Sequence, residues 1–371
     1  MTERPTLGIG LMSGTSLDGM DAALVRFEGP TRVTLLAFAT RPYSPEERAA
    51  IETALDGGSP ADFARLHARL AAWAGDAVQE VLETGRVQAL AVDFIAFPGQ
   101  TLWHEPPAVS WQLGEPAILA EQFGVRVVSN FRSRDVAAGG QGAPLVPMAD
   151  VLLFGATDHP RVLLNIGGMA NLTWVRRRAE ETGAFAFDTG PGMAVIDALA
   201  GWLEPGATCD RDGRLAARGQ PHEPTLGELL ADPYFHQPPP RSTGRERFGA
   251  SFAQALHRRV PGPDGVATAV ELTARSIAAA IGTWVPPGAE VLVSGGGCHH
   301  PGLLASLTAH LGALPVASPV RRFDECFFPG DAKEAVAFAL LGYLAVHGQP
   351  GNLPAATGAA GSRVLGSITP A

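Results

Sequence analysis

Three apolar segments, each of which runs directly into a glycine-rich turn, most strongly constrain the fold of this 371-residue chain. Residues 7–12 lead into Ser-Gly-Thr-Ser, residues 185–187 into Asp-Thr-Gly-Pro-Gly, and residues 290–294 into Gly-Gly-Gly. Glycine leaves backbone N–H groups uncovered, so such turns can bind anions, phosphate above all. Helical patterns follow the second and third turns. We therefore expect an α/β chain with several phosphate-facing turns.

The first turn combines glycine with hydroxyl and carboxyl groups. Thr15 and Ser16 follow Gly14, and Asp18 and Asp21 come directly after them. A carboxylate beside a phosphate site is favourable when a cation such as Mg²⁺ lies between them. The alternative is an ordinary hairpin whose glycine and aspartate residues only satisfy turn geometry. The two hydroxyls and two acids together favour phosphate binding.

The middle and late turns add a second type of candidate. Asp188 stands at a strand end just before Gly190 and Gly192, and a helix over residues 193–203 follows. The helix dipole favours an anion there, and an acid facing it is well placed to act as a general base. Its alternative interpretation is a turn aspartate. In the late turn, residues 295–297 precede a helix over residues 302–311.

Composition excludes several classes of protein. The chain has a single lysine, Lys333, in Gly-Asp-Ala-Lys-Glu-Ala, so it has neither a Walker A loop nor a protein-kinase strand lysine. The net charge of −9 argues against a nucleic-acid partner. No apolar run approaches the roughly 20 residues of a membrane span, and the N-terminal residues do not resemble a signal peptide. We expect a cytoplasmic protein without a membrane partner.

The order of motifs also predicts the domain organisation. The apolar hairpin at residues 162–175 repeats the pattern of the hairpin at residues 7–25, which indicates a weak internal duplication with one hairpin per domain. Residues 238–249 are expected to form an ordered surface loop. The tail, residues 351–371, is rich in Gly, Ala and Pro and is expected to be irregular.

Polar residues beyond two further strands suggest a substrate site. Gln100 follows a short strand over residues 91–96, and Arg132 and Asp135 precede a glycine-rich segment, residues 139–144. Arginine binds carboxylates and phosphates with two parallel hydrogen bonds. The alternatives are a capped turn at Gln100 and a structural Arg–Asp pair.

In their order, the motifs resemble those of the anhydro-N-acetylmuramic acid kinase family, which belongs to the superfamily of acetate kinase, sugar kinases, the heat-shock chaperone ATPase domain and actin. The resemblance covers nearly the whole chain and rests on residues 12–21, 99–101, 131–135, 139–145, 165–168, 188–192, 242–246, 294–297 and 333–335. It implies a two-domain actin-like/sugar-kinase ATPase fold. Each domain would be a mixed sheet flanked by helices, residues 1–130 plus 331–371 and residues 131–330, with an active-site cleft between them.

The resemblance also implies the chemistry. ATP and Mg²⁺ would support hydrolysis of the 1,6-anhydro bond of 1,6-anhydro-N-acetylmuramic acid and phosphorylation of O6, with Asp188 activating water. The residues implied to bind ATP are Gly14, Thr15, Ser16, Leu17, Asp18, Gly19, Met20, Asp21, Gly190, Gly192, Gly295, Gly296 and Gly297, with Asp18 also reaching Mg²⁺ through water. The residues implied to bind the sugar are Gln100, Arg132, Asp135 and Glu334. A homodimer is left open.

Three positions depart from the family pattern: Pro98 replaces a histidine, Met193 replaces an asparagine, and an asparagine expected near His300 is missing. One alternative is a kinase of the same superfamily that acts on another sugar or hydroxy-acid, with Asp188 deprotonating a hydroxyl. The other is an ATP-driven conformational switch, for which the chain is short and has no appended peptide-binding domain.

Overall fold

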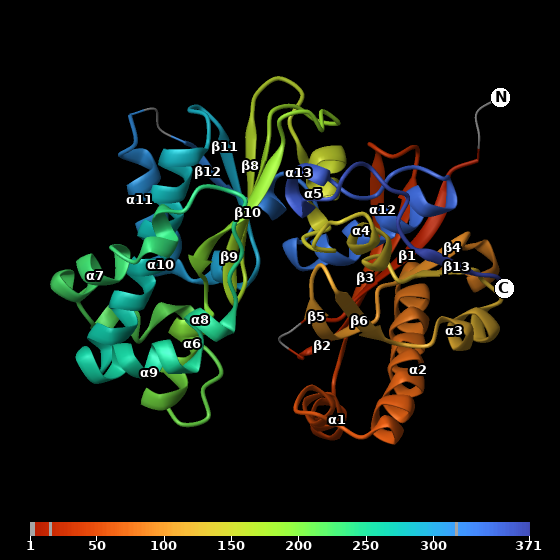
Figure 1. Ribbon diagram of the computed structural model, residues 1–371, viewed down its shortest axis with the longest axis horizontal. Helices are drawn as coiled ribbons and strands as arrows, with labels where there is room; N and C mark the ends of the chain where they lie inside the picture. Colours follow the sequence, from red (N-terminus) through yellow and green to blue (C-terminus); the bar gives the residue numbers. More distant parts are fainter. Residues whose placement is uncertain (1–3, 15–16, 316–317) are drawn as a thin grey trace. The chain divides into compact units, whose positions relative to one another are not determined.

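The structure is a computed structural model that describes residues 4–14, 17–315 and 318–371. Its contacts divide the chain into two units, Met1–Phe154 with Asp331–Ala371, and Gly155–Gly330 (Figure 1). The predicted boundary between residues 130 and 131 differs from this division. Residues 131–154 pack in the first unit because Asp135 bonds to residues 352 and 357 of the same unit.

The first unit contains a six-stranded mixed sheet. Its strand order is β13 (Ser367–Thr369), β7 (Val127–Ser129), β4 (Phe94–Phe97), β1 (Thr6–Met12), β2 (Gly19–Phe27) and β3 (Val33–Pro42). The strands β1, β2 and β3 are antiparallel neighbours, whereas β1, β4 and β7 run parallel. The predicted hairpin at residues 7–25 is confirmed. The carboxyl ends of β1, β4 and β7 meet at one edge of the sheet, which is where α/β proteins bind ligands.

Two long helices cover opposite faces of this sheet. Ile9 and Leu11 of β1 pack in one core cluster with α2 (Pro60–Gly85), which begins at a capping box of Ser59 and Asp62. Gly10 has the opposite orientation, since side chains alternate along a strand. A Cβ at Gly10 would lie 1.9 Å from the carbonyl oxygen of Ala335, so glycine lets α12 (Lys333–Val346) pack directly on β1.

The second unit contains a five-stranded mixed sheet. Its strand order is β10 (Phe185–Pro191), β9 (Met169–Val175), β8 (Arg161–Ile166), β11 (Glu290–Ser294) and β12 (Val320–Arg322). Here too three neighbouring strands, β8, β9 and β10, are antiparallel. On the other side of β8, strands β11 and β12 run parallel to it. The hairpin predicted at residues 162–175 is confirmed. The two sheets therefore share one plan, and the predicted α/β class with mixed sheets flanked by helices is confirmed.

The remaining elements complete the two units. In the first unit they are α1 (Pro45–Leu55), the hairpin of β5 (Gln100–Glu105) and β6 (Val109–Leu113), α3 (Pro116–Phe123), α4 (Ser133–Ala137), α5 (Val146–Ala149), the π-helical turn η2 (Asp150–Phe154) and α13 (Pro354–Thr357). In the second unit they are α6 (Ala194–Leu203), α7 (Glu223–Leu230), α8 (Arg245–Phe248), α9 (Ala250–Arg259), α10 (Pro263–Trp284) and α11 (Pro301–Gly312). Short 3₁₀ turns lie at residues 89–91, 211–213, 216–218, 233–236, 296–299, 323–325 and 330–332.

Two expectations from the sequence need correction. The tail is not irregular throughout, because β13 pairs antiparallel with β7 at the edge of the first sheet. The hairpin of β5 and β6 was not predicted, since its alternation of polar and apolar residues is short. Among the residues that the structure describes, no helix combines the length and the apolar character needed to cross a membrane.

Candidate functional site

The turn after β1 presents few of its predicted residues to solvent. Asp18 is exposed, whereas Leu17 and Met20 are buried in the core of the first unit. Gly19 lies in β2, where a Cβ would meet the carbonyl oxygen of Arg41 at 2.4 Å. Gly14 and Asp21 are partly buried. Thr15 and Ser16 lie outside the described residues. Of the described residues of this turn, Gly14, Asp18 and Asp21 are thus the ones whose surfaces a ligand can reach.

Gln100 is bound to this turn rather than exposed. Its side-chain oxygen accepts a hydrogen bond from Ser13 Oγ at 2.5 Å, and Ser13 Oγ also lies 2.8 Å from the hydroxyl of Tyr43. All three residues are buried. Gln100, the first residue of β5 (Gln100–Glu105), therefore connects β5 to Ser13 just after the end of β1.

Glu334 stands in the first turn of α12, beside Arg132. Burial raises the pKa of Glu334, and the positive charges of Lys333 and Arg132 act in the opposite direction. Burial in turn lowers the pKa of Arg132, and the charge of Glu334 opposes that shift. The Arg132 guanidinium donates to the carbonyl oxygen of Gly142 at 2.8 Å. The structure thus brings together two of the predicted sugar-side residues.

Asp21, another acid of this unit, interacts electrostatically with Glu334. The pKa of Asp21 is raised to about 6, chiefly by burial, with further increases from the charges of Asp18, Glu334 and Asp331. The Thr40 hydroxyl donates to Asp21 Oδ1 at 2.6 Å and partly offsets these effects. This negative region at the end of β1 and the start of β2 favours the approach of a cation.

Asp135 is positioned differently from the other predicted sugar-side residues. It is 0% exposed. Its carboxylate accepts hydrogen bonds from the N–H of Gly142 at 2.7 Å, the amide of Asn352 at 2.7 Å and the hydroxyl of Thr357 at 2.8 Å. Asp135 therefore joins the glycine-rich loop to the tail. A sugar contact by Asp135 stays a prediction, and its observed contacts are those of a structural residue.

In the second unit, Asp188 lies in β10 next to a β-bulge. The pairing of β10 with β9 shifts register between Asp188 and Gly190. Asp188 Oδ2 accepts a hydrogen bond from the N–H of Thr243 at 2.8 Å. Burial raises the pKa of Asp188 to about 6, while the Thr243 bond and the charge of Arg241 lower it and the charge of Glu246 raises it further. Asp188 thus combines an oriented carboxylate with a basicity suited to proton transfer near neutral pH.

Residues 238–249 were predicted to form an ordered surface loop, and the first half agrees with this, since Arg241 is the one buried residue among residues 238–243. Arg241 is 9% exposed. Its guanidinium donates to the carbonyl oxygens of Asp188, Tyr234, Phe235 and Gln237, at 2.6–3.2 Å. Asp188 N donates to the carbonyl oxygen of Arg241 in return. The proline-rich segment therefore folds against β10 and fixes the backbone of Asp188.

The glycines after Asp188 serve close packing. A Cβ at Gly192 would lie 2.2 Å from the carbonyl oxygen of Gly167, and one at Gly190 would meet the Phe235 ring at 2.7 Å. The N–H groups of residues 192–194 donate to the carbonyl oxygens of Gly167 and Gly168. These three donors at the start of α6 thus have partners within the chain, and ATP contacts by Gly190 and Gly192 stay predictions.

The three glycines of the late turn differ from one another. A Cβ at Gly295 would meet Asn165 Oδ1 at 2.6 Å, and one at Gly297 would meet the Ile166 side chain at 2.4 Å. Gly296 is exposed, and a Cβ there would meet no described atom within 4 Å. The outer two glycines hold the turn against β8, and only Gly296 presents an open backbone surface.

Each unit has a hollow lined by described residues. The hollow of the first unit, about 310 Å³, lies beyond the ends of β4 and β7 and is lined by Pro98, Ser110, Trp111, Gln112, Asn130 and Ser133 among others. Ser110 Oγ lies 2.9 Å from His104 Nδ1. Burial lowers the pKa of His104, and the charge of Arg132 lowers it further. This hollow is therefore near Arg132 and lies at the ligand-binding edge of the sheet.

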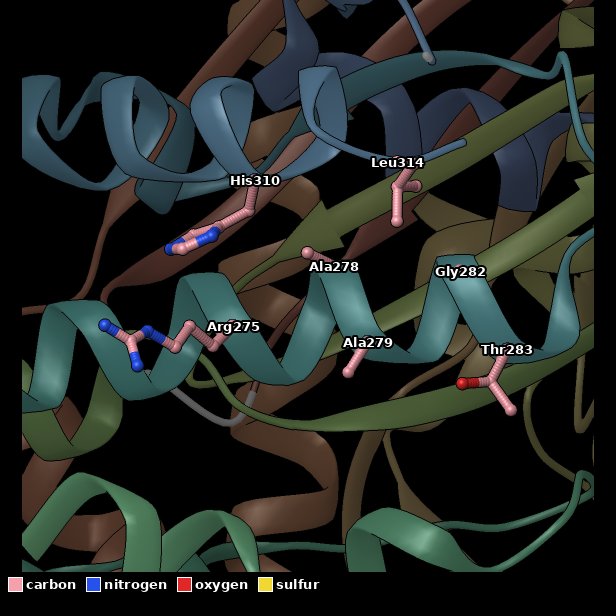
Figure 2. A pocket seen from close by; sticks show the side chains of 7 residues that line it. All are labelled: Arg275, Ala278, Ala279, Gly282, Thr283, His310 and Leu314. Carbon is pink, nitrogen blue, oxygen red and sulfur yellow. The ribbon is translucent and has the colours of Figure 1, made fainter. Parts of the chain in front are cut away.

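The hollow of the second unit, about 350 Å³, lies between α10 and α11. Figure 2 shows Arg275, Ala278, Ala279, Gly282 and Thr283 on α10, with His310 and Leu314 opposite them. Arg275 and His310 both bond to Glu271, at 2.7 and 2.6 Å. No residue predicted to bind ATP or sugar lines this hollow.

A metal site built from side chains alone is absent from residues 4–14, 17–315 and 318–371, because no three His, Cys, Asp or Glu side chains are grouped to hold an ion. His300 is buried, and its Nδ1 accepts from the N–H of Leu303 at the start of α11. Its Nε2 lies 3.2 Å from Asp210 Oδ2. His300 thus caps a helix and anchors residues 210–216 through Asp210.

Comparison with known proteins agrees with this geometry. A family model described as anhydro-N-acetylmuramic acid kinase matches residues 6–371. A protein of that name from Gloeobacter violaceus is 42% identical, over 99% of this chain and 99% of its own. Those from Salinibacter ruber and Pseudomonas paraeruginosa are each 43% identical, over 97% and 98% of this chain and 95% and 98% of their own.

The family match and these relatives indicate a kinase that transfers phosphate to a sugar hydroxyl. The two mixed sheets of similar plan, with acids and glycine turns at their strand ends, fit that class. Within that class, the chain belongs to the anhydro-N-acetylmuramic acid kinase family.

Proposed function

We propose that this chain uses ATP and water to convert 1,6-anhydro-N-acetylmuramic acid into N-acetylmuramic acid 6-phosphate and ADP, a step of peptidoglycan recycling in the cytoplasm. The family supports this substrate. The observation that carries the chemistry is Asp188, a partly buried carboxylate that is oriented through one oxygen and has a pKa raised to about 6. Among the described residues, the hydrogen bond from Thr243 N–H reaches Oδ2 of this carboxylate, which leaves Oδ1 for a water molecule.

The reaction balances with Asp188 as the base. The carboxylate takes a proton from water, the water oxygen bonds to C1 of the sugar, and the C1–O6 bond breaks with its electron pair on O6. O6 then bonds to the γ-phosphorus as the bond to the leaving ADP oxygen breaks. The developing charge on O6 and on the phosphoryl oxygens needs neutralisation more than covalent help. Arg132 supplies a positive charge on the sugar side.

The sugar would occupy the first unit near Arg132 and Glu334. The hollow beyond β4 and β7 supplies hydroxyl and amide groups together with the Trp111 indole, a combination that suits a sugar with an acylamino group. Pro98 lines the same hollow, and it stands at the position where the family pattern has a histidine. One polar contact is thereby removed, and the remaining polar lining is retained.

The phosphates of ATP would bind at the turn of Gly14 and Asp18, and its adenosine would bind at Gly296. Mg²⁺ would supply charge neutralisation for the phosphates. The residues fit it, because Mg²⁺ keeps several waters and needs only one or two carboxylates, and Asp18 is exposed in the negative region with Asp21.

The direct test is ADP release by the purified protein with Mg-ATP, with and without 1,6-anhydro-N-acetylmuramic acid. Turnover that requires the sugar and yields the ring-opened 6-phosphate supports the proposal. Release without any sugar would point to an ATP-driven switch, and turnover only with simple sugars would point to another kinase. Parallel assays with 1,6-anhydroglucose, which has no acylamino group, distinguish these outcomes.

The pH dependence of kcat/KM for the sugar should have an acidic limb near pH 6. A base must be ionised to accept a proton, so raising its pKa to about 6 moves the loss of activity up from the usual range of aspartate. Activity should be constant above this pH and fall about tenfold per pH unit well below it. A profile flat down to pH 5 would contradict the assignment. Because the pKa of Asp21 is also raised to about 6, Asp21→Asn tests which of the two acids produces the limb. If Asp188 produces it, the limb should remain in Asp21→Asn.

Replacing Gly296 by alanine should raise KM for ATP by about tenfold, because an added methyl group would fill space meant for adenosine. Stability should stay unchanged, because that methyl meets no described atom within 4 Å. Gly297→Ala is the matched variant: its methyl would overlap Ile166, so its melting temperature should fall. An unchanged KM for ATP in Gly296→Ala would remove this glycine from the nucleotide site.

A further inference from the structure

The first unit contains a buried ion pair that the proposed mechanism does not use. Lys333, the chain's single lysine, is 4% exposed, and Asp150 is 2% exposed. Lys333 Nζ lies 2.9 Å from Asp150 Oδ1 and 5.9 Å from the centre of the Phe154 ring. Burying two charges costs about as much free energy as their attraction returns, so such a pair is weak evidence of a gain in stability. Its role has to be sought in what it positions.

The pair lies where the chain passes between the two units. Asp150 begins the π-helical turn η2, which ends at Phe154, the last residue before the second unit. Lys333 begins α12, two residues after the chain re-enters the first unit at Asp331. The ion pair therefore joins the two connecting segments on the first unit. π-Helical turns are rare and occur mainly at functional sites.

The same pair determines the surroundings of Glu334, the residue after Lys333. The charged groups that act on Glu334 are Lys333 and Arg132, which favour its ionised form, and Asp150 and Asp18, which disfavour it. Asp21 interacts with Glu334 as well. Without Lys333, Arg132 would be the only one of these groups left to offset burial and the neighbouring acids.

We propose that Lys333 and Asp150 are positioning residues, whose buried ion pair fixes the first turn of α12 where the chain re-enters the first unit and so holds Glu334 in place on the sugar side. The inference rests on the proposed function, because it assigns Glu334 to the sugar side. It adds two residues that the sequence analysis did not place in the site.

The test replaces both partners together. A single substitution leaves one buried charge without its partner, which can prevent folding. The double variant Lys333→Met with Asp150→Leu removes both charges and retains similar volume, so we expect it to fold with a melting temperature close to wild type. The corresponding control is Arg161→Met with Glu290→Leu, which removes another largely buried pair, 2.6 Å apart, at the amino end of β11.

We expect the Lys333/Asp150 double variant to lose at least about tenfold in kcat/KM for the sugar with KM for ATP unchanged. Lys333→Arg, which retains the charge, should retain most of the activity. The Arg161/Glu290 control should leave both parameters at wild-type values.

Wild-type kcat/KM for the sugar in a folded Lys333/Asp150 double variant would overturn the inference. Equal losses in that variant and in the Arg161/Glu290 control would also overturn it, because they would indicate a general loss of rigidity. Failure of the proposed function is distinguishable, since the wild-type protein would then show no turnover that depends on the anhydro sugar.

Discussion

Replacing Asp188 by asparagine should lower kcat by about 10³-fold with little change in KM for ATP. General-base catalysis contributes about 10²–10⁴-fold, and asparagine preserves the shape of the side chain but cannot accept the proton. Its side-chain oxygen can still accept the hydrogen bond from Thr243 N–H, so the loop around Arg241 should remain in place. Steady-state ADP release at saturating sugar measures the effect.

The matched control is Asp197→Asn. Asp197 stands nine residues further on, in α6, and its pKa is likewise raised to about 6, mainly by burial. A general effect of removing a partly buried carboxyl would appear in both variants, whereas loss of the base would appear only at Asp188. Turnover that survives Asp188→Asn would leave the substrate assignment intact and remove Asp188 from the mechanism.

The largest expected effect on stability is at Asp135. Asp135→Ala should lower the free energy of unfolding by about 3–5 kcal/mol, because it leaves three buried donors on Gly142, Asn352 and Thr357 without their acceptor. Asp135→Asn should cost less, since its amide oxygen can replace one of the carboxylate oxygens. Denaturant unfolding measures the change, and Glu121→Ala, an exposed acid on α3, should stay within about 0.5 kcal/mol of wild type.

The outcome at Asp135 also decides between two roles. If Asp135→Asn unfolds at lower denaturant and its residual folded fraction has normal KM for the sugar, the residue is structural. If stability is unchanged and KM for the sugar rises, Asp135 contacts the sugar as the family resemblance implies. The three observed hydrogen bonds and the complete burial favour the first outcome.

Local patterns were sufficient to predict the hairpins at residues 7–25 and 162–175 and the glycine turns, because a hairpin or a strand-to-helix turn involves residues that are close in sequence. The short hairpin of β5 and β6 and the edge strand β13 were missed. Local patterns could not predict the partners of Asp188 and Asp135. Thr243 lies 55 residues from Asp188, and Asn352 and Thr357 lie 217 and 222 residues from Asp135. For the same reason, the sequence did not show that Arg241, in an otherwise exposed segment, bonds to the backbone of Asp188.

Nor can the sequence distinguish two glycines with different roles. Gly296 and Gly297 are adjacent glycines, yet Gly296 faces open space and Gly297 packs on Ile166. The distinction depends on what lies beside each Cα, which is a property of β8 and not of the turn itself. Similarly, Lys333 was used only to exclude other nucleotide sites, because its partner Asp150 is 183 residues earlier in the chain.

The discontinuity of the first unit has a consequence for synthesis on the ribosome. The second unit is one continuous stretch, Gly155–Gly330, so all of its strands have been made before α12 begins. The first unit cannot complete its fold until the end of synthesis, because α12, the Asp135 partners and the edge strand β13 are translated last. We expect the second unit to fold first, while β1 and β4 stay without the helix that covers one of their faces. Nascent chains would then be most prone to aggregation through the first sheet.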